Sequence, residues 1–337
     1  MRVFVTGATG LLGGNLVRLL EQAGHQVTAL VRSPQRAARQ LGPGVTLVEG
    51  DIADVGAFAP ALVGHELLFH TAAFFREYYQ PGDHWAQLQR INIDGTLALL
   101  QAAEAHGVRK VVYASSSGVL GARSDGAPAD ETTPPDALVQ SNLYFRSKLL
   151  AEQAVADFLR TSPLSVTLIL PGWMFGPGDW APTSSGQIVL SFLNRQLPVG
   201  ISGAGAPTDA RDVAAAMLVA AERGRSGERY IVGGDEAVSL RTVFGLLEEL
   251  SGIPGPQLYP PYPMALAYGF GSELFGRLTG KPVLATVAGV RTLREARRTS
   301  SAKAVRELGT TFRPLRDTLR DEIAWFRQER PGDKVTR

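Results

Sequence analysis

The chain has 337 residues, enough for about two domains and a sizeable core. Its 34 Lys and Arg nearly balance 32 Asp and Glu, and a formal net charge of +2 is too small for a nucleic-acid-binding protein. The sequence has no cysteine, which excludes disulfides, thiolate metal sites and a cysteine nucleophile. The cysteine-free composition suits a reducing compartment, and the chain opens in a core strand rather than a signal peptide, so we expect a cytoplasmic protein.

The first predicted element is an apolar strand that runs directly into a glycine-rich turn. Gly7, Gly10 and Gly13 are spaced three residues apart, and leucines at helical spacing begin at Leu11. Glycines without Cβ atoms let backbone N–H groups approach phosphate oxygens, and the N-terminus of the following helix favours an anion. The turn is therefore predicted to bind a pyrophosphate. The alternative is a turn that needs glycine only for steric reasons.

The chain then alternates short apolar runs with helix-like stretches. The apolar runs are residues 26–31, 45–48, 66–72, 110–115 and 165–170. Each fits a strand that is buried on both faces of a parallel sheet. The helix-like stretches are residues 34–40, 55–63, 84–106 and 141–159. This alternation predicts an α/β fold with a doubly wound parallel sheet of the Rossmann type and right-handed crossovers.

Proline density rises after Pro171 and the strict alternation ends, which predicts a smaller, mixed second domain. Residues 209–233 have the pattern of a helix and a strand and are expected to return to the first domain. No apolar run reaches membrane-spanning length, because the stretch 262–275 is short and contains Glu273, so we expect no membrane partner. The predicted division is a dinucleotide-binding domain of residues 1–171 plus 206–236 and a substrate-binding domain of residues 172–205 plus 237–330.

Tyr144 and Lys148 lie one helical turn apart, so the phenol and the ammonium share a helix face. A nearby ammonium favours the phenolate, which lowers the tyrosine pKa and makes the side chain a usable proton donor and acceptor near neutrality. The alternative is an ordinary surface pair. Ser115, Ser116 and Ser117 stand at the carboxyl end of a predicted strand, where open α/β sheets bind ligands, and they favour the catalytic interpretation.

Seven short motifs follow one another along the chain. They are residues 6–13, 50–52, 70–73, 92–96, 113–121, 144–148 and 171–179. In this order they resemble the motifs of the extended short-chain dehydrogenase/reductase family, the NAD-dependent epimerase/dehydratase superfamily. The resemblance covers nearly the whole chain and is greatest to a bacterial branch similar to dihydroflavonol reductases and hopanoid-associated sugar epimerases. Residues 301–309 and 324–326 are also similar to the ending of that branch.

This resemblance implies a catalytic set. Tyr144 would be the general acid/base, and Lys148 would bind the nicotinamide ribose and hold the tyrosine pKa down. Counting back five residues from Gly121, which ends the family motif, selects Ser116 as the catalytic serine. Ser117 and Gly118 occupy the positions of the Asp and Glu of the dehydratase branch, so dehydration is not expected. The alternative for the serines is a strand-end turn held by hydroxyl bonds to the backbone.

The residue after the second predicted strand bears on cofactor choice. An acidic residue there accepts hydrogen bonds from the adenosine ribose, whereas arginine can hold a 2′-phosphate. The chain has Arg32, with Arg36 one turn further on, and therefore predicts NADP. NAD stays an alternative if the arginine only stacks over adenine. Asp51 and Ile52 resemble the family's adenine contacts, and the alternative for Asp51 is a simple turn.

The resemblance implies further cofactor contacts in loops at the carboxyl edge of the sheet. For Ala72 and Ala73 the alternative is that they are ordinary alanines packed against a helix. For residues 171–179 the alternative is a plain turn between domains. Asn92 is expected to fix the neighbouring active-site strand, unless it is an exposed helical residue. The implied contacts are Gly7, Thr9, Gly10, Leu11, Leu12, Gly13, Thr71, Ala72, Ala73, Ser115, Tyr144, Lys148, Pro171, Gly172, Trp173 and Met174.

The sequence thus favours an NADP-dependent reductase of a ketone or aldehyde with Ser116, Tyr144 and Lys148. A nucleotide-sugar epimerase is the second interpretation, although epimerases of this family usually hold NAD. A cofactor-sensing regulator is a third, but such proteins generally lose the Tyr and Lys pair. Aromatic residues near the expected pocket favour an apolar substrate, unless they only pack between domains. They are Phe74, Phe75, Tyr78, Tyr79, Trp85 and Trp173.

Three other features of the sequence concern metal binding, the oligomeric state and a stretch rich in arginine. The five histidines show no metal-ligand spacing, so we expect no metal site. The helices at 84–106 and 141–159 resemble those that the family uses to form homodimers. Four arginines recur at helical spacing and are expected to form a solvated face rather than an anion site, namely Arg291, Arg294, Arg297 and Arg298.

Overall fold

The computed structural model describes residues 1–75, 82–197, 199–200, 202–279, 283 and 286–329. A seven-stranded, fully parallel sheet forms its centre, in the order β10-β6-β5-β4-β1-β2-β3. The predicted doubly wound sheet is therefore confirmed. The strands are β1 (Arg2–Thr6), β2 (Gln26–Val31), β3 (Thr46–Glu49), β4 (Leu67–His70), β5 (Lys110–Ala114), β6 (Ser165–Pro171) and β10 (Arg229–Val232).

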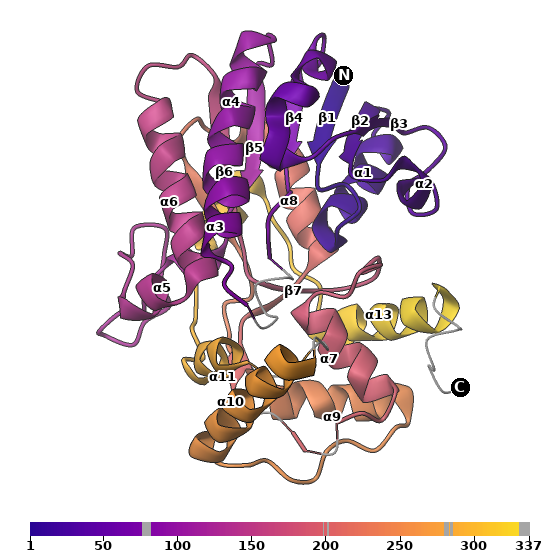
Figure 1. Ribbon diagram of the computed structural model, residues 1–337, viewed down its shortest axis with the longest axis vertical. Coiled ribbons are helices and arrows are strands. Elements are labelled where there is room, and N and C mark those ends of the chain that lie inside the picture. Colours follow the sequence, from indigo (N-terminus) through magenta and orange to yellow (C-terminus); the bar gives the residue numbers. More distant parts are fainter. Residues whose placement is uncertain (76–81, 198, 201, 280–282, 284–285, 330–337) are drawn as a thin grey trace.

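Helices cover both faces of this sheet (Figure 1). In β1, Val3 and Val5 pack into one core cluster and Phe4 into the other, as the period-two alternation of a strand requires. Burial on both faces explains why the strands read as continuous apolar runs. One face carries α1 (Leu11–Gln22), α8 (Ala210–Arg223) and α12 (Ala302–Leu308), and the other carries η1 (Ile52–Ala57), η2 (Ala59–Leu62), α4 (Gly95–Ala105) and α6 (Leu143–Phe158).

Two predicted helices differ in form from the expectation. The stretch 55–63 is made of short 3₁₀ helices rather than an α-helix, consistent with Gly56 and Pro60 inside it. The stretch 84–106 is divided into α3 (Trp85–Leu88), the π-helix η4 (Gln89–Asp94) and α4. The π-helix lies where Asn92 bonds across to the loop after β4, described below. Helix α2 (Pro34–Ala37) is shorter than predicted.

Residues 209–233 return to the sheet as expected, because β10 pairs in parallel with β6. The remaining elements lie outside this sheet, and several of them share a separate core cluster that includes Phe192, Phe244 and Phe326. Ala304 and Leu308 of α12 instead join the core beside the sheet. The division into two domains stays a prediction. These elements are β7 (Trp173–Phe175), α7 (Ser184–Leu193), β8 (Ala204–Gly205), β9 (Pro207–Asp209), β11 (Val238–Ser239), α9 (Leu240–Ser251), α10 (Tyr262–Thr279), α11 (Val287–Arg294) and α13 (Leu315–Glu329).

Glu322 of α13 is a carboxyl group buried among the elements that lie outside the sheet. Its side chain is fully buried, and Oε2 accepts a hydrogen bond from the backbone N–H of Gly176 at 3.1 Å. Burial, reinforced by the charge of Asp179, raises the pKa of Glu322 well above its ordinary value. When the pKa of a carboxyl group is higher in the folded than in the unfolded state, the free energy of unfolding falls as pH rises from the unfolded-state pKa to the folded-state pKa.

We predict that Glu322→Gln unfolds less readily than wild type at pH 8, because glutamine keeps an acceptor for Gly176 without a buried charge. The difference in unfolding free energy should be about 1 to 3 kcal/mol and should shrink as pH falls toward the unfolded-state pKa near 4.3. Urea unfolding across this pH range measures it, with Glu329→Gln at the exposed end of α13 as the control. Equal pH dependence in Glu322→Gln and wild type would contradict the prediction.

Candidate active site

The glycine-rich turn between β1 and α1 packs directly against the end of β4. Gly7 has φ of +72°, and a Cβ there would lie 2.6 Å from the backbone nitrogen of Ala72. A Cβ on Gly13 would lie 2.2 Å from the carbonyl oxygen of Gly7. Both positions therefore require glycine. Gly10 caps α1 without any side-chain bond, so the first N–H groups of the helix can face an anion.

The other predicted cofactor residues around this turn differ in their hydrogen bonds and in how far they are buried. Thr71 is tied to β1, since its hydroxyl donates to the carbonyl oxygen of Thr6 at 2.7 Å. Thr9, Ala72 and Ala73 are half-buried. Leu11 and Leu12 are buried in the first turn of α1. The turn lies between β1 and β4, where the strand order reverses, which is the ligand-binding position of open α/β sheets.

The candidate adenosine contacts lie farther along this edge. Asp51 caps η1, because its Oδ1 accepts from the backbone N–H of Ala53 at 2.9 Å. Ile52 is only 5% exposed and packs in the core. Arg32 follows β2, and Arg36 lies in α2, and both are exposed. Within the described residues neither guanidinium has an ion-pair partner, which leaves both available to a ligand.

Tyr144 and Lys148 both lie in α6, as predicted, but the hydrogen bonds of the Lys148 amino group go to other residues. Asn142 starts the helix by accepting hydrogen bonds from the backbone N–H groups of Tyr144 and Phe145. The Lys148 amino group is almost completely buried and donates to the carbonyl oxygen of Ala114 at 2.8 Å and to the hydroxyl of Tyr113 at 3.3 Å. Burial lowers the pKa of Lys148 to about 7.

The predicted lowering of the Tyr144 pKa is wrong for this structure. The ring of Tyr144 lies 4.9 Å from that of Phe75 and 5.9 Å from that of Phe145, and the residue is 7% exposed. This burial raises the pKa of the phenol above its ordinary value. The sequence spacing could not show this aromatic enclosure, and burial is the cause of the shift in the Tyr144 pKa.

The three serines after β5 have different partners. Ser115 donates its hydroxyl proton to the carboxylate of Glu152, so it is not the backbone-bonded turn residue considered above. Ser116 Oγ accepts from the backbone N–H of Gly118 at 3.1 Å. Its hydroxyl proton stays available to a ligand in the cavity, whose lining includes Ser116. Ser117 lies beside it on the same wall.

Asn92 connects the loop after β4 to α6. Its Oδ1 accepts from the backbone N–H of Phe74 at 2.7 Å, and its Nδ2 donates to the carbonyl oxygen of Phe74 at 3.2 Å and to Ser147 Oγ at 3.0 Å. Asn92 is 1% exposed, so it is not the exposed helical residue of the alternative. It fixes the loop and helix around Tyr144 rather than the strand β5.

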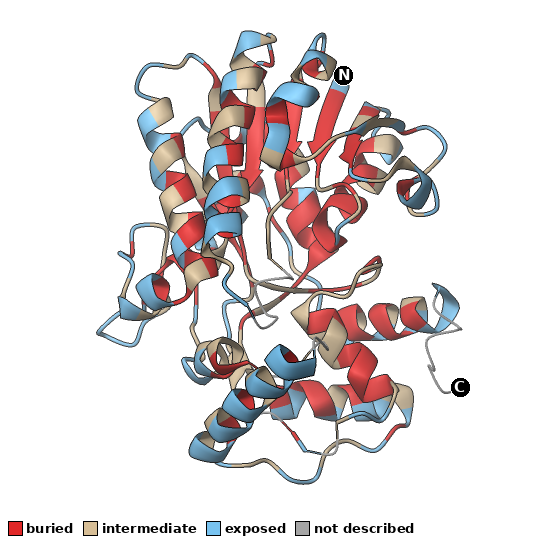
Figure 2. Cartoon of the chain, viewed as in Figure 1, coloured by how far each residue is buried: buried red, intermediate tan, exposed pale blue. Residues whose placement is uncertain are grey.

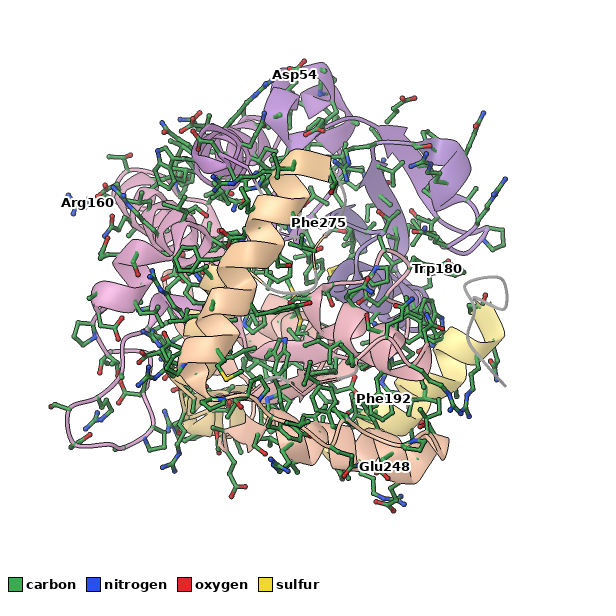
Figure 3. All side chains as sticks on the ribbon, turned by 60° about the horizontal axis from the view of Figure 1, so that its bottom comes forward. Asp54, Arg160, Trp180, Phe192, Glu248 and Phe275 are labelled. Carbon is green, nitrogen blue, oxygen red and sulfur yellow. The ribbon has the colours of Figure 1, made fainter. Side chains whose placement is uncertain are left out.

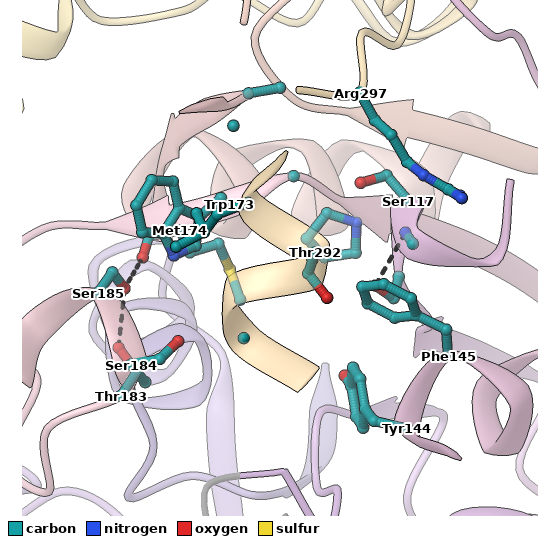
Figure 4. A pocket seen from close by; sticks show the side chains of 18 of the residues that line it. Ser117, Tyr144, Phe145, Trp173, Met174, Thr183, Ser184, Ser185, Thr292 and Arg297 are labelled. Atoms are coloured by element: carbon teal, nitrogen blue, oxygen red, sulfur yellow. Dashed lines mark hydrogen bonds between the residues drawn. The ribbon is translucent and has the colours of Figure 1, made fainter. Parts of the chain in front are cut away.

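A cavity of about 590 Å³ opens beside these residues. Tyr144, Phe145 and Ser117 lie on one side of it, and Trp173, Met174 and Ser185 lie on the other (Figure 4). The lining includes the predicted residues Ser115, Ser116, Tyr144, Pro171, Gly172, Trp173 and Met174. It does not include Lys148 or the glycine-rich turn.

Sequence reasoning missed the far wall of the cavity, which comes from α7 and α11 through residues such as Gln187, Ile188, Val290 and Leu293. No motif marks these positions. Glu152 was also missed, although its spacing of four residues after Lys148 could have indicated a shared helix face. Its carboxylate forms an ion pair of 3.1 Å with Arg229 of β10.

One of the four arginines expected on a solvated face is a structural residue instead. The Arg297 side chain is 13% exposed, and its Nη2 donates to both carboxylate oxygens of Asp136 at 2.7 and 2.8 Å. Helix α11 ends at Arg294, so the helical spacing does not extend to this position. Tyr78 and Tyr79, which were expected near the pocket, lie outside the described residues.

A tightly packed glycine turn at the switch point of a parallel sheet, with a tyrosine lining a nearby cavity and a buried lysine on the same helix, is typical of a dinucleotide-dependent oxidoreductase. The chain belongs to the NAD-dependent epimerase/dehydratase family, whose model matches residues 3–233. It is accordingly an NAD(P)-dependent enzyme of the extended short-chain dehydrogenase/reductase type.

Curated relatives of the chain carry reductase and demethylase names. A Methylococcus capsulatus protein named sterol demethylase protein B is 34% identical over 334 residues, covering 97% of this chain and 99% of that protein. A Synechocystis sp. protein with the provisional name dihydroflavonol 4-reductase is 33% identical over 329 residues, covering 96% and 94%. A Stigmatella aurantiaca protein named 4-hydroxy-2-methyl-3-oxo-4-farnesyl-3,4-dihydroquinoline-1-oxide ketoreductase is 31% identical over 260 residues, covering 75% and 74%.

Solved structures share the fold over nearly the whole chain. The crystal structure of gox2253 has a TM-score of 0.82 and 35% identity, covering 97% of this chain and 98% of that one. MoeE5 in complex with UDP-glucose and NAD has a TM-score of 0.75 and 27% identity, covering 98% and 99%.

We predict that Gly13→Ala weakens dinucleotide binding at least about tenfold and lowers stability, because its Cβ would overlap the Gly7 carbonyl oxygen. Gly14→Ala is the matched control, since a Cβ there meets its nearest atom at an ordinary 3.5 Å. Fluorescence titration with NADPH and thermal unfolding measure both effects. Equal behaviour of the two variants would show that the close packing of the turn does not limit binding.

Proposed function

We propose that this enzyme is an NADP-dependent carbonyl reductase that acts on an apolar ketone or aldehyde. The observation that carries the proposal is the cavity, in which Tyr144 and Ser116 face a mainly apolar enclosure. Among its described lining residues the only charged side chains are Arg297 and Arg298. Arg297 is already paired with Asp136, which leaves Arg298 as the one described lining cation without an ion-pair partner for the diphosphate of a nucleotide sugar.

The residues present fit a dinucleotide. Gly7 and Gly13 leave a cradle that a Cβ would fill, and an uncapped helix N-terminus lies beside it. In our proposal the turn holds the pyrophosphate, and Arg32 and Arg36 hold the 2′-phosphate of NADP. The bound nicotinamide supplies a hydride to the carbonyl carbon of the substrate.

Tyr144 acts as the proton donor to the substrate oxygen. The raised pKa of the phenol keeps it protonated at neutral pH, which is the form that reduction of a carbonyl requires. Ser116 donates a second hydrogen bond to the same oxygen with the hydroxyl proton that Gly118 does not use. The two donors thus polarise the carbonyl group and neutralise the oxygen.

Lys148 supports proton return to Tyr144. A buried amine with a pKa of about 7 is partly protonated at neutrality and can give up or take up a proton. Its hydrogen bonds to Ala114 and Tyr113 hold the amino group at the end of β5, next to the serines.

The names of the relatives agree with an apolar carbonyl substrate, since they refer to a sterol, a flavonoid and a farnesylated quinoline. The solved complex of MoeE5 with UDP-glucose and NAD supports the second candidate, a nucleotide-sugar epimerase. That candidate is the less favoured one here, because Arg298 is the one unpaired cation among the described lining residues and the rest of the lining is mainly apolar. A homodimer through α4 and α6 stays a prediction.

We predict that Arg32→Ala lowers NADPH affinity about tenfold to a hundredfold and changes NADH affinity little, because a charge-assisted hydrogen bond contributes roughly 1.5 to 3 kcal/mol. Wild type should bind NADPH more tightly than NADH. Titration of both cofactors measures this, with Arg39→Ala, a nearby exposed arginine, as the control. Equal affinity of wild type for the two cofactors would remove the basis for assigning NADP.

We predict that wild type oxidises NADPH in a one-to-one ratio with reduction of an apolar carbonyl compound from a substrate panel.

Tyr144→Phe should lower kcat about a hundredfold or more with nearly unchanged NADPH affinity, because only the transferred proton is lost. Tyr259→Phe, a tyrosine outside the cavity lining, is the control. Near-normal turnover of Tyr144→Phe would refute the catalytic assignment. Purification with bound NAD and inversion of a sugar stereocentre would establish the epimerase instead.

A further inference from the structure

Helix α10 presents large apolar side chains to solvent. Six of them are 53–78% exposed, namely Met264, Tyr268, Phe270, Leu274, Phe275 and Leu278. Exposed residues predominate along this helix in Figure 2, and Figure 3 looks onto the helix with Phe275 labelled. Single exposed apolar residues are ordinary, but a contiguous set marks an interaction surface.

Four of the six residues form one stripe along the helix together with Gly271, and Phe270 and Leu274 lie to one side of it. Met264, Tyr268, Gly271, Phe275 and Leu278 are spaced by four, three, four and three residues, which places them on one face. The opposite face is buried through small residues, Ala265, Gly269 and Gly276. This helix therefore packs through its small side chains and keeps its large apolar ones outside, the reverse of an ordinary surface helix.

The charged residues of α10 lie off this stripe. Glu273 and Arg277 are about 100° or more from its centre on a helical projection. The Glu273 carboxylate accepts from the backbone N–H of Val287 at 2.7 Å, so it holds α10 against α11. The stripe itself carries no charged residue over the length of α10.

The segment of the chain that contains α10 and α11 is basic. Residues 258–298 contain six basic and two acidic side chains, a net charge of +4, whereas the whole chain carries only +2. Arg297 is paired with Asp136, and Lys281 lies outside the described residues. The basic side chains that this segment exposes are Arg277 on α10, Arg291 and Arg294 on α11, and Arg298.

We propose that the α10 stripe docks the protein onto the surface of an anionic lipid bilayer. The helix would lie in the plane of the interface, with its apolar side chains at the acyl boundary and the arginines at the headgroups. Within the described residues no helix is long and apolar enough to cross a membrane. The sequence expectation of no membrane partner considered spanning segments only, and surface contact needs no such segment.

Charge favours a lipid surface over a second copy of the chain. A two-fold contact through α10 would bring the same arginines of both copies together, and like charges at short range oppose association. Helix α11 packs against the buried face of α10 and lines the cavity with Val290 and Leu293, so docking would leave the cavity one helix away from the interface. An apolar substrate dissolved in the bilayer would then have a short route to the cavity. The docking itself does not depend on the proposed reaction.

Co-sedimentation of the full chain with lipid vesicles tests this proposal. We expect binding to mixed phosphatidylcholine and phosphatidylglycerol vesicles, weaker binding to phosphatidylcholine alone, and loss of binding as salt is raised. Tyr268→Ser with Phe275→Ser should weaken binding at least about tenfold. Arg277→Gln with Arg291→Gln should weaken binding only to the mixed vesicles. Val63→Ser, at an apolar residue 58% exposed outside α10, is the matched control.

Circular dichroism and thermal unfolding establish that the variants are folded, as expected for substitutions at exposed positions. Failure of wild type to bind the mixed vesicles, or equal binding by the α10 variant, would overturn the proposal. Sedimentation velocity provides the third outcome: a dimer that Tyr268→Ser with Phe275→Ser dissociates, without vesicle binding, would identify a second copy as the occupant. None of these readouts uses turnover, so failure of the reductase proposal would be seen separately.

Discussion

The candidate site depends first on the steric closure of the turn between β1 and α1. Gly7 and Gly13 bring the backbone of the turn, the start of α1 and the end of β4 into contact without intervening side chains. Thr71 secures the same junction by donating to the carbonyl oxygen of Thr6. The N-terminus of α1 is thereby fixed at the switch point of the sheet, and every other candidate cofactor contact is arranged relative to it.

A buried polar network performs the corresponding task on the catalytic side. Glu152 of α6 accepts from Ser115 after β5 and pairs with Arg229 of β10, so three elements are tied together one turn beyond Lys148. A buried carboxylate is tolerated only when such partners satisfy it. The strand that returns from the second half of the chain therefore does more than extend the sheet, because it supplies the cation that neutralises Glu152.

The fold could be predicted in large part because its signals are local. Apolar runs, glycine spacing and the separation of Tyr144 from Lys148 depend on the nearest few residues of the chain. The direction of the Tyr144 pKa shift could not be predicted, because it depends on Phe75 and Phe145 enclosing the ring. The far wall of the cavity, from α7 and α11, likewise arises from tertiary contacts that no motif announces. Arg297 was misread for the same reason, since its partner Asp136 is distant in sequence.

The environment of Tyr144 distinguishes the two candidate reactions on physical grounds. An epimerase must first oxidise its substrate, which requires the tyrosine to accept a proton, whereas a reductase starts with a tyrosine that donates one. Aromatic burial favours the neutral phenol and thus the donating form. In our proposal, the same apolar enclosure that raises this pKa also favours apolar over diphosphate-bearing substrates. Proton donation and the proposed substrate preference then have one physical cause, the low polarity around Tyr144.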